Sequence, residues 1–364
     1  MKGKETMNLK FLPVLLFAVT AAHAVENGFT VEHTDHGVSV SVGRQRFASY
    51  VIDQANKPYL WPVYGPTGKA MTRAYPMQDV PWETKEQLDH PHHRGITFGH
   101  ESIGGGTWSF PATSDEWTKI TGDEKHAGGG DTWHERMTFV EFMQKPKLAL
   151  RGKQRLPMVA GIRHREFTEV RADADKATLV ELCDYVDPIG KRFLTEERRL
   201  TFRVLGEIRV IDVDQTFIAT DGEVRFADRK DAGLSIRIPS SMAVDSKQGG
   251  QIINSDGLTD KDAWSKPARW CDYHGPVDGE HLGIAILNHP ASYRHPTRWH
   301  VRSYGLFSAN PFAQHDYDPA LPDGTTTLKS AERLKLHHRF IFHTGDSVTA
   351  KIEAAWQEYA KETK

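Results

Sequence analysis

The stretch ATLVELCDYVDPIGKRFLTEERRLTFRVLGEIRVIDVDQTFIA at residues 177–219 decides the fold. It holds three runs rich in Val, Ile, Leu, Thr and Phe, at Ala177–Val186, Glu197–Val204 and Glu207–Ala219. Runs of this composition, separated by Gly, Pro and charged residues, are typical of β-strands. No crossover helix separates the runs, which favours antiparallel pairing between neighbours.

Segments of the same kind recur outward from this stretch in both directions. They lie at Val38–Val42, Phe47–Ile52, Glu166–Arg171, Leu234–Ile238, Gly283–Leu287, Trp299–Tyr304 and Leu334–His343. Helical periodicity is convincing only near the C-terminus, where Asp346 or Ser347 caps a segment that runs to about Glu362. We therefore predict an all-β fold, a large antiparallel sandwich or barrel with a short C-terminal helix, in one domain at residues 25–364.

The N-terminal segment differs in composition from the rest of the chain. Met7–Ala24 has a lysine, an apolar run and an Ala-His-Ala cleavage signal, which predicts a signal peptide at residues 1–24. The start codon, Met1 or Met7, stays open, and an uncleaved anchor is the alternative to cleavage. No later run is long enough to span a bilayer stably. We expect an exported protein, in the periplasm or outside the cell.

Composition narrows the classes of partner. The 364 residues carry a formal net charge of −2 and are 38% hydrophobic, so no overall field favours nucleic acid or an anionic membrane. The two cysteines, Cys183 and Cys271, could pair in an oxidising compartment. Nothing in the sequence places them near each other, and their pairing stays open.

The run DHPHHRGITFGH at residues 89–100 contains four histidines and one arginine. Imidazole serves in acid/base chemistry and as a metal ligand. If residues 92–100 formed one straight strand, His92 and His100 would lie about 26 Å apart and His93 would face away from His92. His90 and His92 would lie about 7 Å apart and could chelate a divalent metal. The third ligand would come from His134, His289 or His300, and bonding only to backbone or water is the alternative.

A second cluster, NHPASYRHPTRWHVRSYGLFSANPF, spans residues 288–312. On a strand at Trp299–Tyr304, alternation places His300, Arg302 and Tyr304 on one face. Such a row offers an acid or base, an anion-binding group and an aromatic surface. A solvated strand face with chance polar residues is the alternative.

Two charged blocks lie between these clusters. Asp228 and Lys230 form either a buried acid/base pair or, more commonly, a surface ion pair. The block at residues 196–199, Glu-Glu-Arg-Arg, is predicted to lie on the surface. The chain has no Gly-x-Ser-x-Gly elbow, no phosphate-binding loop, no dinucleotide fingerprint and no zinc-binding helix motif. We therefore expect no nucleotide cofactor, and a divalent metal remains open.

Five motifs together resemble the PmoA-like domain family, a group of exported bacterial proteins. They are DHPHHRGITFGH at 89–100, VRFADRKDAGLSIRI at 224–238, WCDYHG at 270–275, GIAILNHP at 283–290 and PTRWHVRSYGLFSANPF at 296–312. The resemblance implies a β-sandwich of supersandwich type, similar to galactose-mutarotase-like carbohydrate enzymes. The family label refers to a membrane-bound methane oxygenase subunit, which conflicts with the lack of a spanning segment after the signal peptide. The resemblance assigns no catalytic residue.

The motif chemistry gives the leading hypothesis, an exported enzyme that acts on a carbohydrate or a sugar-derived small molecule as a lyase, isomerase or hydrolase. No carboxylate pair is as conspicuous as the histidines, which disfavours a conventional glycosidase. Arg94 and Arg302 would bind a carboxylate, a sulfate or a polarised carbonyl oxygen. The alternatives are a non-catalytic carbohydrate-binding envelope protein and, third, a metal-dependent oxygenase.

The sequence thus gives a set of candidate residues. If they form one active site, the two histidine clusters should lie close together in the fold. The catalytic candidates are His92, His93, Arg94, His100, Asp228, Lys230, His289, His300 and Arg302. The candidates for substrate binding are Trp108, Trp117, Arg294, Trp299, Tyr304 and Asn310, and those for a metal are His90 and His92.

Overall fold

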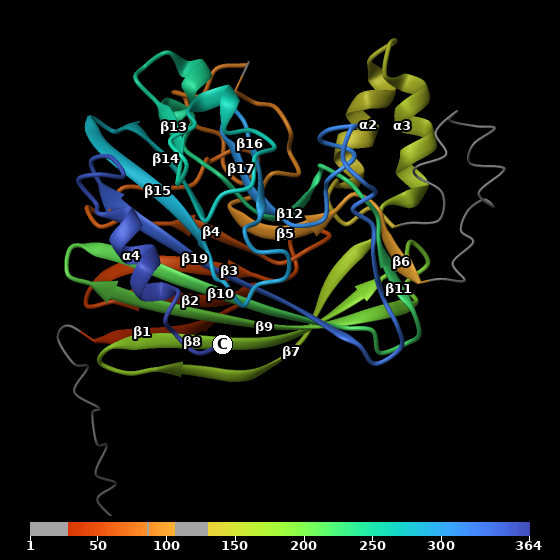
Figure 1. The fold of residues 1–364 in the computed structure, drawn as a ribbon, viewed down its shortest axis with the longest axis horizontal. Coiled ribbons are helices and arrows are strands. Elements are labelled where there is room, and N and C mark those ends of the chain that lie inside the picture. Colours follow the sequence, from red (N-terminus) through yellow and green to blue (C-terminus); the bar gives the residue numbers. More distant parts are fainter. Residues whose placement is uncertain (1–27, 86, 106–129) are drawn as a thin grey trace, which may run out of the picture.

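The computed structural model describes residues 28–85, 87–105 and 130–364, and β-strands dominate this part of the chain (Figure 1). The first antiparallel sheet has the order β1 (Phe29–Thr34), β2 (Gly37–Val42), β3 (Gln45–Val51), β4 (Tyr59–Val63), β5 (Ile96–His100), β12 (Ala232–Arg237), β17 (Leu306–Asn310) and β16 (Arg298–Val301). The second has the order β13 (Gln251–Asn254), β14 (Trp270–Val277), β15 (Glu280–Asn288), β19 (Arg333–Thr344), β10 (Ile208–Ile218), β9 (Arg192–Leu205), β8 (Lys176–Val186) and β7 (Gly161–Ala172). A small third sheet joins β18 (Thr326–Leu328), β11 (Val224–Phe226) and β6 (Ile103–Gly105).

The stretch at residues 177–219 forms β8, β9 and β10, which pair as antiparallel neighbours in the second sheet. In β9, Glu197 and Arg199 are exposed as predicted, whereas Glu196 and Arg198 are buried. The surface prediction for these two is wrong because strand alternation turns every second side chain inward. Inside the fold, the Arg198 guanidinium donates to both Glu196 oxygens and to the Tyr50 hydroxyl of β3.

The core lies between the two large sheets. Phe47 of β3 meets Phe202 of β9 with ring centroids 5.5 Å apart, and Phe98 of β5 meets Phe217 of β10 at 4.9 Å. Each fully buried side chain of this kind contributes roughly 1.5–3 kcal/mol to the free energy of unfolding. The expected antiparallel β-sandwich is confirmed. Nine of the ten predicted strand segments form strands over nearly their whole length, and the tenth, at residues 299–304, is a strand only as far as Val301.

The helices are α2 (Arg136–Gln144), α3 (Ala149–Arg155) and α4 (Ile352–Tyr359), with short 3₁₀ turns η2 (Leu156–Met158), η3 (Ser240–Met242), η4 (Val244–Ser246) and η5 (Asp260–Asp262). Figure 1 shows α2 and α3 together at one end of the molecule, beyond β6, and α4 on the opposite side. The sequence predicted only the C-terminal helix, and with an earlier start.

The start of α4 shifts because Asp346 caps a turn instead of the helix. Its Oδ1 accepts the backbone N–H of Thr349 at 2.8 Å, and Lys351 then has a φ of 54°, outside the helical region. The helix buries Ile352 and Tyr359 against a small apolar cluster on the second sheet.

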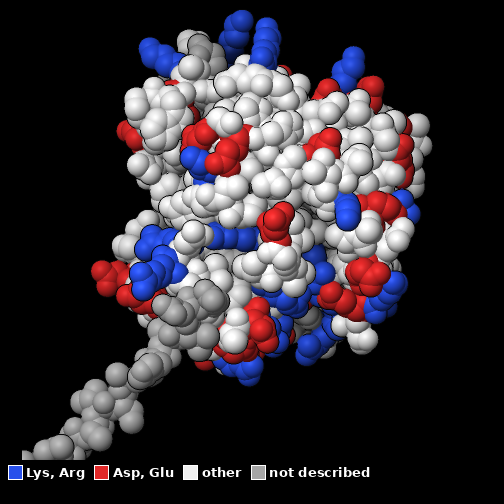
Figure 2. All heavy atoms as spheres, turned by 90° about the vertical axis from the view of Figure 1, so that its left-hand side faces the viewer, with Lys and Arg blue, Asp and Glu red and all other residues white. Residues whose placement is uncertain are grey.

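Three further features bear on the predictions. Cys183 and Cys271 are both buried and free. None of the helices in the described residues combines the length and the apolar character needed to cross a bilayer. Figure 2 shows basic and acidic side chains interspersed on the face that it presents.

Candidate functional site

The candidate site begins in the segment that leads into β5. This strand starts only at Ile96, so residues 89–95 form a tight turn instead of a strand. His90 has a φ of 46° and Gly95 a φ of 43°. A Cβ at Gly95 would lie 1.9 Å from the carbonyl oxygen of Leu60, so only glycine fits there.

This turn gathers the histidines into a compact group, the imidazole cluster, made of His90, His92, His93 and His134. The ring centroids of His92 and His93 lie 4.3 Å apart, those of His90 and His93 lie 4.9 Å apart and stacked, and those of His92 and His134 lie 4.5 Å apart. The straight-strand prediction that His93 faces away from His92 is therefore wrong. The reason is the turn, which removes strand alternation.

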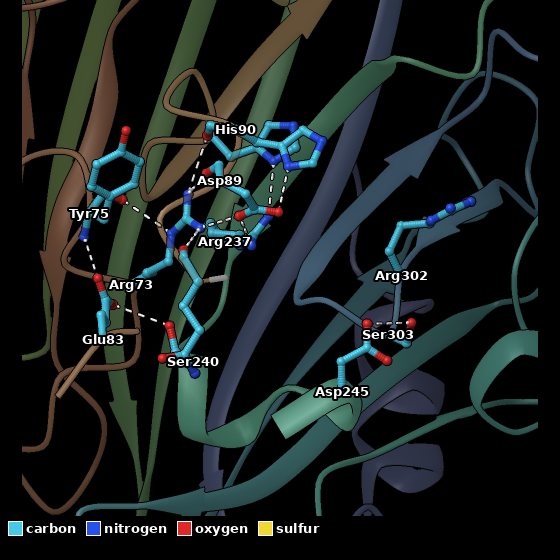
Figure 3. Close-up of polar contacts among 12 residues, drawn as sticks. Arg73, Tyr75, Glu83, Asp89, His90, Arg237, Ser240, Asp245, Arg302 and Ser303 are labelled. Atoms are coloured by element: carbon cyan, nitrogen blue, oxygen red, sulfur yellow. Dashed lines mark hydrogen bonds and ion pairs between the residues drawn. The ribbon is translucent and has the colours of Figure 1, made fainter. Parts of the chain in front are cut away.

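Asp89 lies beside the cluster and binds two buried arginines (Figure 3). Its Oδ1 accepts from Arg73 Nη1 at 2.7 Å and from Arg237 Nη2 at 2.5 Å, and its Oδ2 lies 2.6 Å from His90 Nδ1. Burial opposes ionisation of Asp89, but these neighbours outweigh it and lower the pKa of the carboxyl. Arg73 donates all five of its N–H groups, mostly to backbone carbonyls of residues 75–90. Arg73 therefore organises the loop that carries Asp89.

The tautomer of His93 follows from its partner. Arg237 Nη1 lies 3.2 Å from His93 Nδ1, and a guanidinium can only donate. Nδ1 of His93 is therefore the acceptor, and the ring hydrogen lies on Nε2. Burial, followed by the charges of His92, His90 and Arg237, holds the pKa of His93 well below its usual value. His93 is thus a neutral imidazole that donates from Nε2.

His134 has the opposite tautomer. Its Nδ1 lies 2.9 Å from Oδ2 of Asp131, which as a carboxylate accepts only. Asp131 is fully buried, and it also accepts the backbone N–H groups of Trp133 and His134 and a bond from Arg155. Burial alone would raise the pKa of Asp131, but His134 and Arg155 lower it overall. With this hydrogen on Nδ1, the neutral form of the His134 ring has an unprotonated Nε2.

Arg94 and Lys57 bind Glu135 and Trp133, the two residues on either side of His134. Arg94 donates to both oxygens of Glu135, at 2.7 and 2.9 Å, directly before α2. Lys57 is 2% exposed and donates to the carbonyl oxygen of Trp133 at 2.7 Å. Burial lowers the pKa of Lys57 to about 8, although Glu135 favours its charged form.

The second motif reaches the cluster through a turn. β16 ends at Val301, and the N–H of Arg302 donates to the carbonyl oxygen of Leu306. The prediction of one strand through Tyr304 is therefore wrong, because the chain reverses direction here. The Tyr304 ring stacks on His90 with centroids 5.0 Å apart and 1° between the planes. Tyr304 of the second motif thus contacts the imidazole cluster. The histidines of the second motif, His289, His295 and His300, make their contacts elsewhere.

His300 lies on β16 farther from the cluster. Its Nδ1 donates to the carbonyl oxygen of Lys230 at 2.6 Å, and Nε2 lies 4.0 Å from Asp231. Burial lowers the pKa of His300. Asn310 donates to the same Lys230 carbonyl, whereas the Lys230 side chain is exposed. The Lys230 carbonyl, just before β12, thus joins His300 of β16 and Asn310 of β17.

The carboxylate of Asp228 is occupied by backbone donors, whereas an acid/base role requires an oxygen that can reach the substrate. Its two oxygens accept backbone N–H groups from Gln314, His315, Asp316 and Gly324. All four donors belong to one loop, so this carboxylate orders the loop.

Several other sequence candidates lie away from the imidazole cluster. His100 is fully buried at the end of β5, where Nδ1 accepts the N–H of Ser102. His289 packs against Tyr359 of α4, Arg294 donates to the carbonyl oxygens of Pro311 and Gly324, and Trp299 is buried in the core. Trp108 and Trp117 lie outside the described residues.

Sequence reasoning did not identify Arg73, Lys57, Asp131, Glu135 or Arg237. Asp131 and His134, three positions apart, were the only pair with a local signal. In the described part of the chain, no group of three or more His, Cys, Asp or Glu side chains is arranged to hold a metal ion. The metal ligation expected of His90 and His92 stays a prediction.

Comparisons with solved structures give distant likenesses of fold. The Slr1438 protein from Synechocystis sp. PCC 6803 is 11% identical, with 93% of this chain and 100% of that chain covered and a TM-score of 0.37. A galactose mutarotase related enzyme from Lactobacillus acidophilus is 10% identical, with 87% and 95% covered and a TM-score of 0.32. A polysaccharide lyase is 10% identical over 89% of this chain and 33% of that chain, with a TM-score of 0.33.

The search of curated proteins gives no match. One family model, described as "Family of unknown function (DUF6807)", matches residues 37–357, which include both histidine motifs and nearly every strand. The chain therefore belongs to this family.

Proposed function

We propose that the protein is an exported enzyme that moves a proton on a sugar derivative, as an isomerase or lyase. The observation that carries the proposal is the pair of opposite tautomers in the imidazole cluster. His134 offers an unprotonated Nε2 and His93 offers an Nε2–H, and both rings lie within 4.5 Å of the His92 ring. Export rests on the signal peptide predicted at residues 1–24, a segment that lies outside the described residues.

An unprotonated and a protonated Nε2 suit proton abstraction beside a carbonyl group. His134 accepts the proton from the carbon, and the electron pair moves onto the carbonyl oxygen. His93 donates a hydrogen bond to that oxygen as its negative charge develops. Return of a proton from water to the other face gives an epimer. Departure of an oxygen leaving group from the next carbon, with the proton of the His134 imidazolium passing to that oxygen, gives an unsaturated sugar.

Buried carboxylates and cations keep the two imidazoles in their roles. Asp131 stabilises the imidazolium that forms when His134 accepts the proton, as the carboxylate of a catalytic triad does. Arg237 prevents His93 from accepting a proton at Nδ1, so His93 stays a donor. The sugar class rests on the partly exposed Trp264 ring, which suits stacking on a sugar, and on the carbohydrate-enzyme resemblance of the motifs.

Turnover in D₂O tests the proposal. The purified protein is incubated with a panel of neutral and acidic sugars, their keto derivatives and oligosaccharides, and NMR follows deuterium at carbon and any new double bond. His134→Gln and His93→Gln should each lower kcat by roughly 10²–10⁴. His33→Gln, at an exposed position of β1, is the matched control and should keep full activity.

Unchanged kcat in both variants would refute the assignment of these histidines. Binding of a glycan by the wild-type protein without exchange or turnover on any member of the panel would favour the non-catalytic carbohydrate-binding alternative. Circular dichroism and thermal unfolding of each variant separate loss of chemistry from loss of fold.

A further inference from the structure

Arg302 differs from the other arginines around the site because none of the carboxylates in the described part of the chain forms an ion pair with it. Its guanidinium carbon lies 5.5 Å from the Trp264 ring centroid and 5.7 Å from that of Tyr304. Among the described residues, its side chain forms neither an ion pair nor a hydrogen bond. Figure 3 shows it extending away from Asp245 and Ser303. The Trp264 and Tyr304 rings hold the Arg302 guanidinium in place. Within the described residues, its N–H groups have no hydrogen-bond acceptor.

Tyr304 joins this arginine to the imidazole cluster. The Arg237 guanidinium carbon lies 4.9 Å from the same ring, and His90 stacks on it at 5.0 Å. Arg302 and Tyr304 are half-buried and His90 is exposed. The free guanidinium therefore lies on the solvent side of the cluster, one aromatic ring away from the imidazoles.

Three arginines beside the cluster pair with two carboxylates. Arg94 is neutralised by Glu135 through two hydrogen bonds, but the single carboxylate of Asp89 serves both Arg73 and Arg237. Burial and the nearby Arg237 charge lower the pKa of Arg73 to about 10. Glu83 and Asp231 also act on these groups, and Arg302 adds a positive charge that a bound anion would pair with.

We infer that the substrate of the proposed reaction is an acidic sugar whose carboxylate binds Arg302 between Trp264 and Tyr304. The planar guanidinium fork matches a planar carboxylate through two parallel hydrogen bonds. Trp264, which is partly exposed, offers apolar ring surface to the C–H groups of the sugar. The sugar ring rests on the proposed function, whereas the negative charge rests on the geometry of Arg302 alone.

Equilibrium binding tests the inference without any need for turnover. Calorimetry and the fluorescence of the tryptophans follow titrations with glucuronate and galacturonate and their oligosaccharides, with glucose and galactose, and with the corresponding sulfated sugars. The wild-type protein should bind the acid at least tenfold more tightly than the neutral sugar. Arg302→Gln should remove that preference, and Arg302→Lys should keep only part of it because lysine lacks the planar fork.

Arg44→Gln, an exposed arginine in the β2–β3 turn, is the matched control and should bind as the wild type does. Equal affinity of the wild-type protein for acidic and neutral sugars, or wild-type affinity in Arg302→Gln, would overturn the inference. Arg302-dependent binding of sulfated sugars alone would overturn the carboxylate assignment.

The outcome is separate from that of the proposed function. Arg302-dependent binding of uronates with no proton exchange on any sugar would leave this inference standing while the enzyme proposal failed. Turnover of neutral sugars that Arg302→Gln leaves unchanged would do the reverse.

Discussion

A single carboxylate, Asp228, holds the loop that follows β17. Each of its oxygens accepts two backbone N–H groups, and a Cβ at Gly324 would lie 2.9 Å from Oδ2 and 2.5 Å from the Phe312 carbonyl oxygen. The loop therefore closes tightly around the two acceptor oxygens of Asp228. These contacts favour a structural role for Asp228 over the catalytic role suggested by its charge in the sequence.

Asp228→Asn should lower the free energy of unfolding by about 1–3 kcal/mol, because the amide replaces an acceptor oxygen with a donor that faces backbone N–H groups. Urea unfolding measures the change. Asp318→Asn, where an exposed side chain accepts one N–H from Ala320, is the control and should change stability by less than about 1 kcal/mol. Equal effects of the two substitutions would refute the structural role.

Residue chemistry was predictable at the site, but the partners of each residue were not. The histidines of residues 89–100 were identified by composition, yet the tautomer of His93 depends on Arg237, 144 positions away. Arg237 lies in an apolar strand and looks like an ordinary alternating residue. The Asp131–His134 pair could have been found, since a carboxylate three positions before a histidine is a local signal.

At the scale of secondary-structure elements, the segment before β5 is linked to helix α2. Arg94 links them by donating two hydrogen bonds to Glu135, which directly precedes α2. Helix α2 was missed in the sequence because it is short and its N-cap, Glu135, makes no side-chain capping bond. Its position depends on tertiary contacts such as this ion pair and the packing of Gly152, where a Cβ would lie 2.7 Å from the Phe139 carbonyl oxygen.

Arg94→Lys should lower the free energy of unfolding by about 1–3 kcal/mol, because lysine cannot make the paired bonds to Glu135. Binding of sugars by the folded variant should stay within about threefold of the wild type. Chemical unfolding and calorimetric titration measure the two effects. A rise in the dissociation constant without loss of stability would instead favour the substrate-binding role that the sequence suggested for Arg94.

Across the whole molecule, buried neutral histidines couple stability to pH. Burial lowers the pKa of His100 and of His338 to about 3 in the folded protein, whereas the unfolded chain takes up their protons near pH 6.5. Stability is therefore complete above pH 6.5 and falls below it, by roughly 1.4 kcal/mol per pH unit for each such histidine. His343 contributes with the opposite sign, since its bond to Asp272 raises its pKa despite burial.

His338→Gln should weaken this dependence. Urea unfolding at pH 7.5 and pH 5.5 should give a smaller loss of stability in the variant than in the wild type, by about the share of one histidine. The comparison is between the two losses, so a uniform cost of the substitution cancels. An identical loss in both proteins would show that His338 is not neutral in the fold.

The architecture as a whole was the most predictable level, because many segments along the chain are rich in β-branched and aromatic residues and no crossover helix separates them. The arrangement of strands within each sheet was not predictable. For example, β5 pairs with β12, and Ser235 Oγ bonds to a carbonyl 138 positions away. Alternation gives each strand an inner face, but it does not determine the partner strand.

The ion pair between Asp89 and Arg237 joins residues 148 positions apart, which affects how the protein folds. A loop of that length must close before the pair forms, and folds dominated by such distant pairings fold slowly. A chain emerging from its N-terminus would carry its histidine turn unpaired until β12 has been made. Tyr304 arrives later still. Ligand binding should therefore be among the last properties to recover during refolding.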